Sequence, residues 1–147
     1  MTKGVMTMKK KALIIGLILV LCVGIFGSYA VLDCVFPKAE PISCPDLNEI
    51  ESALIARNKE DYSEVGNEQL EELLQKISSA EPTRRMSVND YPTTETYYKF
   101  EVSADRMYCY FIYEESGQIY VELPYEGIYK SDESILNLVS DCLTQLN

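Results

Sequence analysis

The stretch TYYKFEVSADRMYCYFIYEESGQIYVEL, residues 96–123, decides the fold of this chain. Side chains alternate along three of its segments with the period of two that is typical of β-strands. The alternation predicts strands at about 96–102, 107–114 and 118–123. The turn residues Ser116-Gly117 separate the last two strands. The stretch therefore predicts a three-stranded antiparallel meander.

The length of the first turn decides which side chains share a face of this meander. A three-residue turn at 104–106 places Phe100 beside Tyr110, and a two-residue turn at 116–117 places Tyr113 beside Tyr120. With this register, one face collects most of the apolar side chains, and we expect it to be the core. Its members are Tyr98, Phe100, Val102, Tyr108, Tyr110, Ile112, Ile119, Val121 and Leu123.

Two segments outside the meander have the period of amphipathic helices. The first covers residues 68–79, with Asn67 as the expected N-cap, and the second covers residues 132–146, with Ser131 as the expected N-cap. Their apolar stripes are Leu70, Leu73, Leu74 and Ile77 in the first, and Ile135, Val139, Cys142 and Leu146 in the second. The predicted fold class is therefore α+β, an antiparallel sheet with both helices on one face.

The segments around these elements are less regular. Residues 50–56 favour a strand over a helix, and the polar residues 58–66 indicate a loop. Gly127 follows the third strand, where we expect it to supply a positive φ.

The N-terminal part of the chain has the pattern of an export signal. Lys3 and the lysines at 9–11 precede residues 12–32, which carry no charge. Twenty-one residues span roughly 31 Å as a helix, enough to cross a hydrocarbon core of about 30 Å. We expect residues 12–32 to form a transmembrane or signal-anchor helix, with residues 1–11 in the cytoplasm and the rest outside the cell membrane. The alternative is a secretory signal peptide, cleaved after Ala30, and a secreted domain.

Three prolines divide this segment from the rest. Pro37, Pro41 and Pro45 fall within residues 33–46, which we expect to be a linker or stalk, and residues 47–147 form the predicted extracytoplasmic domain.

Composition excludes several classes of function. The chain has no histidine, which removes imidazole-based catalysis and histidine-bearing zinc sites. Beyond residue 30, nine basic residues face 23 acidic ones, a net charge of −14 that disfavours nucleic acid as a partner. No phosphate-binding glycine loop and no metal-ligand spacing is present, so we expect no catalytic residues, no metal and no cofactor.

Four of the five cysteines, Cys34, Cys44, Cys109 and Cys142, follow the apolar segment. Cys34 and Cys44 are the pair that could form a disulfide without any assumption about the fold. In the predicted sheet Cys109 points away from the core and Cys142 toward it, so we expect these two not to pair.

One candidate ligand site lies before the meander. Arg84 and Arg85, with Ser87 and Asn89, could bind a carboxylate or phosphate through guanidinium contacts. The alternative is that each arginine pairs with a neighbouring glutamate.

A second candidate site is the sheet face opposite the predicted helices. Tyr97, Phe111, Tyr113 and Tyr120 share this face. An open aromatic face suits a protein, peptide or glycan partner. The alternatives are that the first strand or the stalk covers the face, or that the tyrosines are simply half-exposed.

Two motifs carry a family resemblance. They are Thr-Arg-x-x-Ser-Val-Asn-Asp-x-Pro at residues 83–92 and Tyr-x-Glu-x-Pro-Tyr-x-Gly-Ile-Tyr at residues 120–129. The chain resembles a family of exported or membrane-anchored domains of unknown function from Gram-positive Firmicutes. The resemblance covers about the last 100 residues and implies a compact domain held outside the membrane, with no activity to carry over.

Together these observations lead us to expect a membrane-anchored domain with a non-catalytic binding, sensing or accessory role at the cell envelope, where its partner is an envelope protein or peptide. One alternative is a protein inhibitor or immunity-type factor. Another is an acidic cell-wall hydrolase that uses Glu101 and Glu122 as paired carboxylates.

Overall fold

The structure is a computed structural model that describes residues 3–58 and 60–144. The chain divides into two compact units, one up to Pro37 and one from Lys38 onward. Each unit is described by itself.

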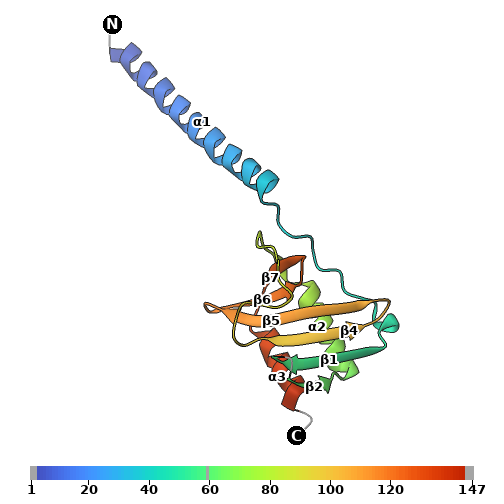
Figure 1. Cartoon of the computed structure of the whole chain (residues 1–147). Coiled ribbons are helices and arrows are strands. Elements are labelled where there is room, and N and C mark those ends of the chain that lie inside the picture. The colour runs from blue at the N-terminus through green and yellow to red at the C-terminus, as the bar shows by residue number, and fades with distance from the viewer. Residues whose placement is uncertain (1–2, 59, 145–147) are drawn as a thin grey trace. The chain divides into compact units, whose positions relative to one another are not determined.

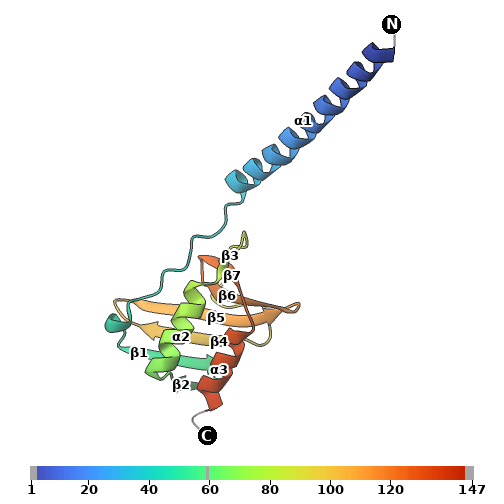
Figure 2. The same cartoon turned by 180° about the vertical axis from the view of Figure 1, so that it is seen from behind.

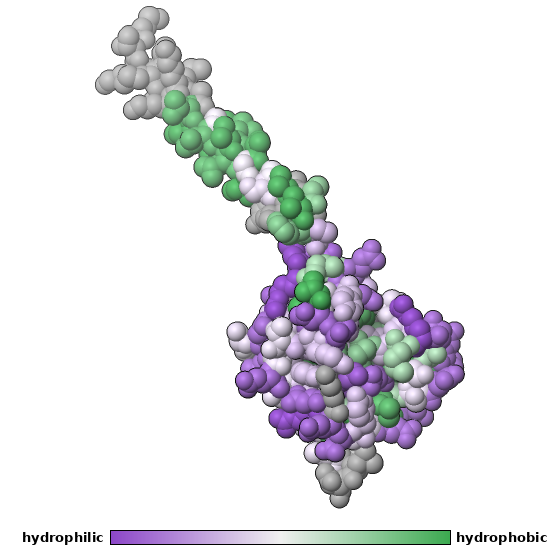
Figure 3. Space-filling view, in the orientation of Figure 1, coloured by the Kyte–Doolittle hydropathy of each residue, from purple (hydrophilic) through white to green (hydrophobic). Residues whose placement is uncertain are grey.

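The first unit is a single helix, α1 (Lys3–Val35). Large apolar side chains cover it, and those of Leu13, Leu17 and Val20 are more than half exposed. Figure 3 shows this unit as largely hydrophobic in colour. Within the described part of the chain, no helix meets the length and hydropathy of a membrane span. The helix expected at 12–32 is thus present as part of α1, while its crossing of a membrane stays a prediction.

The second unit is an α+β domain built on one antiparallel sheet. Its elements in chain order are η1 (Leu47–Glu49), β1 (Ser52–Arg57), β2 (Glu60–Glu64), α2 (Asn67–Ser78), β3 (Glu81–Pro82), β4 (Tyr98–Ser103), β5 (Met107–Glu115), β6 (Gln118–Leu123), β7 (Gly127–Ser131) and α3 (Ser134–Thr144). The seven strands lie in the order β2-β1-β4-β5-β6-β7-β3. Figure 2 shows α2 and α3 lying across the same face of this sheet.

The meander has the predicted register. Phe100 pairs with Tyr110 between β4 and β5, and Tyr113 pairs with Tyr120 between β5 and β6. The main core lies between this face and the two helices, where the nine alternating side chains meet the stripes of α2 and α3. Leu73, Ile77, Ile135 and Val139 are fully buried there. Both helices therefore cover the face that the alternation predicts.

Three strands are absent from the sequence prediction. Residues 58–66, expected to be a loop, contain β2, and β3 and β7 extend the sheet on its other side. Strand β2 is polar because it is an edge strand with little buried surface, so it has no apolar alternation to reveal it. Charged residues on such an edge also discourage pairing with other chains.

The helix starts also differ from the prediction. The N-cap of α2 is Gly66, one residue before the expected Asn67, and a glycine has no side chain to cap the helix. Ser131 belongs to β7, and the carboxylate of Asp132 instead accepts the Ser134 N–H (2.9 Å) at the start of α3. The last residues of the expected 132–146 helix, 145 and 146, lie outside the described residues.

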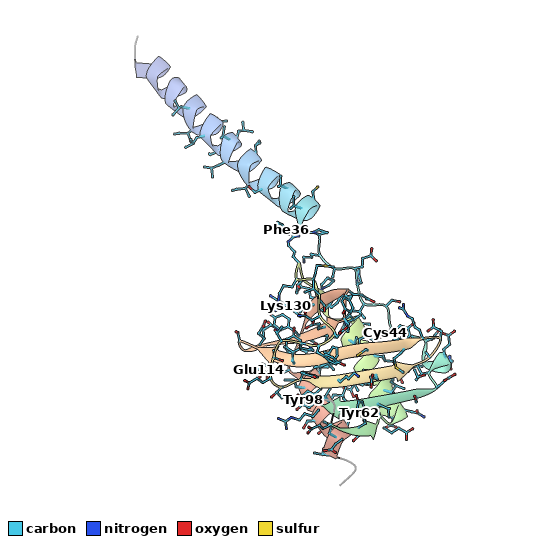
Figure 4. All side chains as sticks on the ribbon, in the orientation of Figure 1. Phe36, Cys44, Tyr62, Tyr98, Glu114 and Lys130 are labelled. Atoms are coloured by element: carbon cyan, nitrogen blue, oxygen red, sulfur yellow. The ribbon has the colours of Figure 1, made fainter. Side chains whose placement is uncertain are left out.

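Part of the expected stalk is folded onto the domain. We call residues 38–44 the strap. Ile42 is buried in the core, and the thiol of Cys44, which is labelled in Figure 4, donates to the Leu74 carbonyl (3.6 Å). The domain therefore begins at Lys38 and not at residue 47, because the prolines favour an extended chain without keeping it away from the sheet.

The expected positive φ lies two residues before Gly127. Tyr125 has the positive φ of 62°, and Gly127 does not. At Gly127 a Cβ would lie 2.6 Å from the Cβ of Ala39. The glycine therefore permits the close approach of the strap and is not needed for a left-handed backbone.

Candidate functional site: the loop over the sheet

One long irregular segment covers the sheet face opposite the helices. Residues 83–97 join β3 to β4 without forming a helix or strand, and we call them the cover loop. Figure 1 shows this segment crossing in front of the sheet, with the helices behind. Loops of this length in compact domains are uncommon and often functional.

An aromatic cluster lies beneath the cover loop. Tyr97, Phe111 and Tyr113 are at most 8% exposed, and Tyr120 packs against them half-buried. The ring of Tyr91 from the loop meets Phe111 edge-on at 5.7 Å, and Tyr97 does so at 5.4 Å. The four predicted partner-binding aromatics thus share one face as expected. The expectation that this face is open is wrong, because the cover loop buries it, and the covering segment is neither the first strand nor the stalk.

A buried carboxylate joins the loop to the sheet. Glu122 of β6 is only 5% exposed. Its two oxygens accept hydrogen bonds from the Ser87 hydroxyl (2.7 Å) and the Tyr113 hydroxyl (2.9 Å). Burial, together with the neighbouring Glu122 carboxylate, raises the pKa of Tyr113, so the phenol remains a donor. A buried acidic group requires such donors, and Ser87 supplies one from the loop.

The base of the loop is tied to β7. The Thr83 hydroxyl donates to the Ile128 carbonyl (2.5 Å), and the Ile128 N–H donates to the Arg85 carbonyl (3.0 Å). The Arg85 guanidinium pairs with Glu115 (2.6 Å) and lies 5.0 Å from the ring centre of Tyr120. The bond to Glu115 is the main reason that the pKa of Arg85 is raised.

The structure does not bring the four predicted anion-site residues together. Ser87 points inward to Glu122, Arg85 pairs with Glu115, and Asn89 is exposed. Arg84 is half-buried. An anion approaching Arg85 and Ser87 would meet two carboxylates, so the alternative of arginine–glutamate pairing holds for Arg85.

The two carboxylates considered for hydrolysis are also engaged. Glu101 pairs with Lys99 (2.7 Å), and Glu122 lies under the cover loop. Burial leaves Glu122 out of reach of a polymeric glycan on the surface. This arrangement does not support the cell-wall hydrolase alternative.

Four of the exposed apolar residues of the domain lie on the cover loop and the turn beside it, and others, such as Leu47 and Met107, lie elsewhere. Met86, Val88, Tyr91 and Tyr125, which we call the loop patch, are between 40% and 72% exposed. The hydroxyl of Tyr125 donates to the Asp90 carboxylate (2.6 Å), which joins the turn to the loop. Figure 3 shows the surface of the domain as mainly hydrophilic with small apolar areas.

The loop patch is absent from the sequence prediction, because its burial pattern is visible only in the structure. In Met86-Ser87-Val88 the small polar residue is buried and its apolar neighbours are exposed. This inverts the usual arrangement, in which apolar side chains are inside. Only the buried acceptor Glu122, 35 residues away, explains the inversion.

Other groups give no sign of a metal or redox site. In residues 3–58 and 60–144 no group of three or more metal-ligating side chains comes together. All five cysteines are free thiols, including the candidate pair Cys34 and Cys44. Cys142 is in the helix-side core, whereas Cys109 lies against the aromatic cluster on the other face, as predicted.

A hollow of about 800 Å³ lies apart from the predicted sites. It is bounded by the β1–β2 hairpin and the end of α3, with Tyr62, Tyr98 and Leu143 among its walls. It holds none of the candidate residues of the sequence analysis.

Comparison with known proteins places the domain in a family but assigns no activity. Residues 38–130 match the family model DUF5301, described as "Domain of unknown function (DUF5300)". The match begins with the strap. A solved structure, described as "NMR structure of the protein from Ruminococcus gnavus", is similar to 64% of this chain and 97% of its own, with a TM-score of 0.54 and 27% identity. No curated protein matches the chain.

Proposed function

The chain belongs to the DUF5301 family of domains of unknown function, and from that premise we propose that its domain is a non-catalytic module that binds a protein or peptide through the loop patch. The proposal depends on one observation, that four large apolar side chains on one ordered loop and its adjoining turn are exposed. Methionine and tyrosine are enriched at protein interfaces, so the chemistry of this patch suits a partner protein.

The cover loop is held in place before any partner arrives. Ser87 anchors its centre to Glu122, and Thr83 and Arg85 anchor its base to Ile128. A loop that is already ordered loses less conformational entropy on binding, which favours affinity.

The conformation of Tyr125 supports the same surface. Its φ of 62° is uncommon for a residue with a side chain and costs free energy. The hydrogen bond to Asp90 holds the exposed ring beside the loop. Backbone strain that serves an exposed side chain is typical of a functional position.

We further propose that the domain acts outside the cytoplasmic membrane. The support is the basic N-terminus followed by 21 uncharged residues, and the exposed apolar side chains of α1, which need a lipid or protein environment. An alkaline phosphatase fusion after Asn147 should be active, and a fusion of the domain without residues 1–37 should not. Recovery of the intact chain in the membrane pellet after carbonate washing would indicate an anchor. Release of a chain that begins at residue 31 would indicate cleavage.

The binding proposal is tested by capture from the cell envelope with the full chain. A Met86→Ser/Val88→Ser variant removes apolar surface from the loop patch. The matched control, Leu47→Ser/Met107→Ser, removes exposed apolar surface elsewhere. We expect one partner to be captured by the parent and the control but not by the loop variant.

Retention of the partner by both variants would contradict the proposal. If the captured protein is an enzyme that loses activity in the complex, the module is an inhibitor and not a sensor. The same two variants then measure whether inhibition depends on the loop patch.

A further inference from the structure

The strap is bonded to the first residue of the cover loop. The Ala39 N–H donates to the Thr83 carbonyl (2.9 Å), and the Tyr129 hydroxyl donates to the Glu40 carbonyl (2.8 Å). Thr83 in turn bonds to Ile128 through both its N–H and its hydroxyl. A continuous series of hydrogen bonds therefore runs from the strap to the loop base and β7.

Gly127 is the residue that allows this contact. A Cβ at position 127 would lie 2.6 Å from the Cβ of Ala39, which is closer than two such atoms can approach. Because Gly127 has no positive φ, its backbone could accommodate another residue. The absence of a Cβ at Gly127 thus allows the strap to dock on β7.

The two ends of the strap are held unequally. Toward its C-terminal end Ile42 is buried, and Pro45, which follows the strap, is buried as well. At the other end, Lys38 forms only an exposed ion pair with Glu81 (3.5 Å), and Glu40 is exposed. Exposed ion pairs contribute little, so residues 38–40 are held mainly by the hydrogen bonds of the Ala39 N–H and the Glu40 carbonyl, and they can detach while Ile42 stays in place.

We propose that the strap regulates binding by the loop patch. When residues 38–40 are docked, the cover loop keeps its binding conformation, and when they are released, the cover loop becomes more mobile. This inference rests on the proposed binding function and assigns its control. The strap directly follows the N-terminal unit in the chain, so a pull or a contact on that unit acts first on Lys38 and Ala39. The loop base is the next structure that such a displacement reaches, because Ala39 is bonded to Thr83.

Hydrogen exchange of the full chain tests the coupling without a partner. Gly127→Ala pushes Ala39 away, and we expect exchange of the amides at residues 84–91 to rise about tenfold, with β4 and β5 unchanged. The double variant Ala39→Gly/Gly127→Ala removes the clash and should return the loop to within about twofold of the parent.

Three results would overturn the inference. They are unchanged exchange at residues 84–91 in Gly127→Ala, an equal rise throughout the domain, and a double variant that fails to restore the loop. The last result would point to the Tyr129 ring, which lies 3.4 Å from the same Cβ position. None of these results depends on a partner, so they are separate from a failure of the capture experiment.

Discussion

The two faces of the sheet are covered in different ways. On one face, regular alternation in β4–β6 meets two helices with regular apolar stripes. On the other, an irregular loop covers an aromatic cluster and a buried carboxylate. The helix face is therefore held mainly by apolar burial, whereas the loop face depends on a few specific polar contacts that a single substitution can remove.

The helix face should respond most strongly to substitution. Leu73→Ala in α2 removes a fully buried side chain, so we expect the free energy of unfolding to fall by about 2–5 kcal/mol in urea denaturation. The control Glu71→Ala changes an exposed position of the same helix. A loss below about 1 kcal/mol for Leu73→Ala would contradict the packing of α2 on the sheet.

On the loop face, we expect a substitution of Glu122 to lower the free energy of unfolding. Glu122→Gln keeps the shape but turns one acceptor into a donor facing the hydroxyls of Ser87 and Tyr113, so we expect a loss of about 1–3 kcal/mol. Amide exchange at residues 84–91 should rise at the same time. Glu114→Gln, on an exposed position of β5, is the matched control. Equal stabilities of the two variants would show that Glu122 does not hold the loop.

Cys109 and Cys142 lie on opposite sides of the sheet, so the pH dependence of their reactivity compares the two faces. Burial raises the pKa of the Cys109 thiol from 9.0 to about 11, with Lys99 opposing and Glu101 adding to the shift. Protonated Cys109 is thus favoured by folding, and this contribution to stability is present below pH 9 and is lost as the pH rises through about 11.

Alkylation by iodoacetamide measures this shift. The rate at Cys109 should rise about tenfold per pH unit between pH 8 and 10, and Cys142, buried in the helix-side core, should react more slowly. Cys109→Ser and Cys142→Ser assign the two rates. A plateau near pH 9 for Cys109 would contradict its burial.

The smallest effect is expected at the edge of the loop. Arg85→Gln breaks a partly exposed pair with Glu115, so we expect a loss of about 0–1 kcal/mol and little change in loop exchange. A loss of stability comparable to that of Glu122→Gln would mean that Arg85, and not Ser87, is the main anchor of the loop.

The helix face could be predicted because periodicity records repeated contacts. Leu70, Leu73, Leu74 and Ile77 follow the helical period, and the pairing of Phe100 with Tyr110 follows from turn length. Strand β2 and the strap could not be predicted in this way. One is a polar edge, and the other is a proline-containing segment whose docking depends on the close contact between Ala39 and Gly127.

The candidate site was predicted only in part. The sequence identified the aromatic face and the 83–92 segment as special, but as two separate sites. The structure joins them, because the segment lies on the face and Ser87 finds Glu122. No local pattern records a contact between residues 35 positions apart, so the exposure of the loop patch could not be derived from the sequence.

Proton NMR of the domain tests most directly whether the cover loop lies on the aromatic face. The structure predicts cross-relaxation between the rings of Tyr91 and Phe111, whose centres are 5.7 Å apart, and between the side chains of Ser87 and Tyr113, which share Glu122. It also predicts a slowly exchanging Tyr113 hydroxyl. Absence of these contacts, with fast solvent exchange at Tyr113, would mean that the aromatic face is open and that the partner-binding surface is the sheet and not the loop.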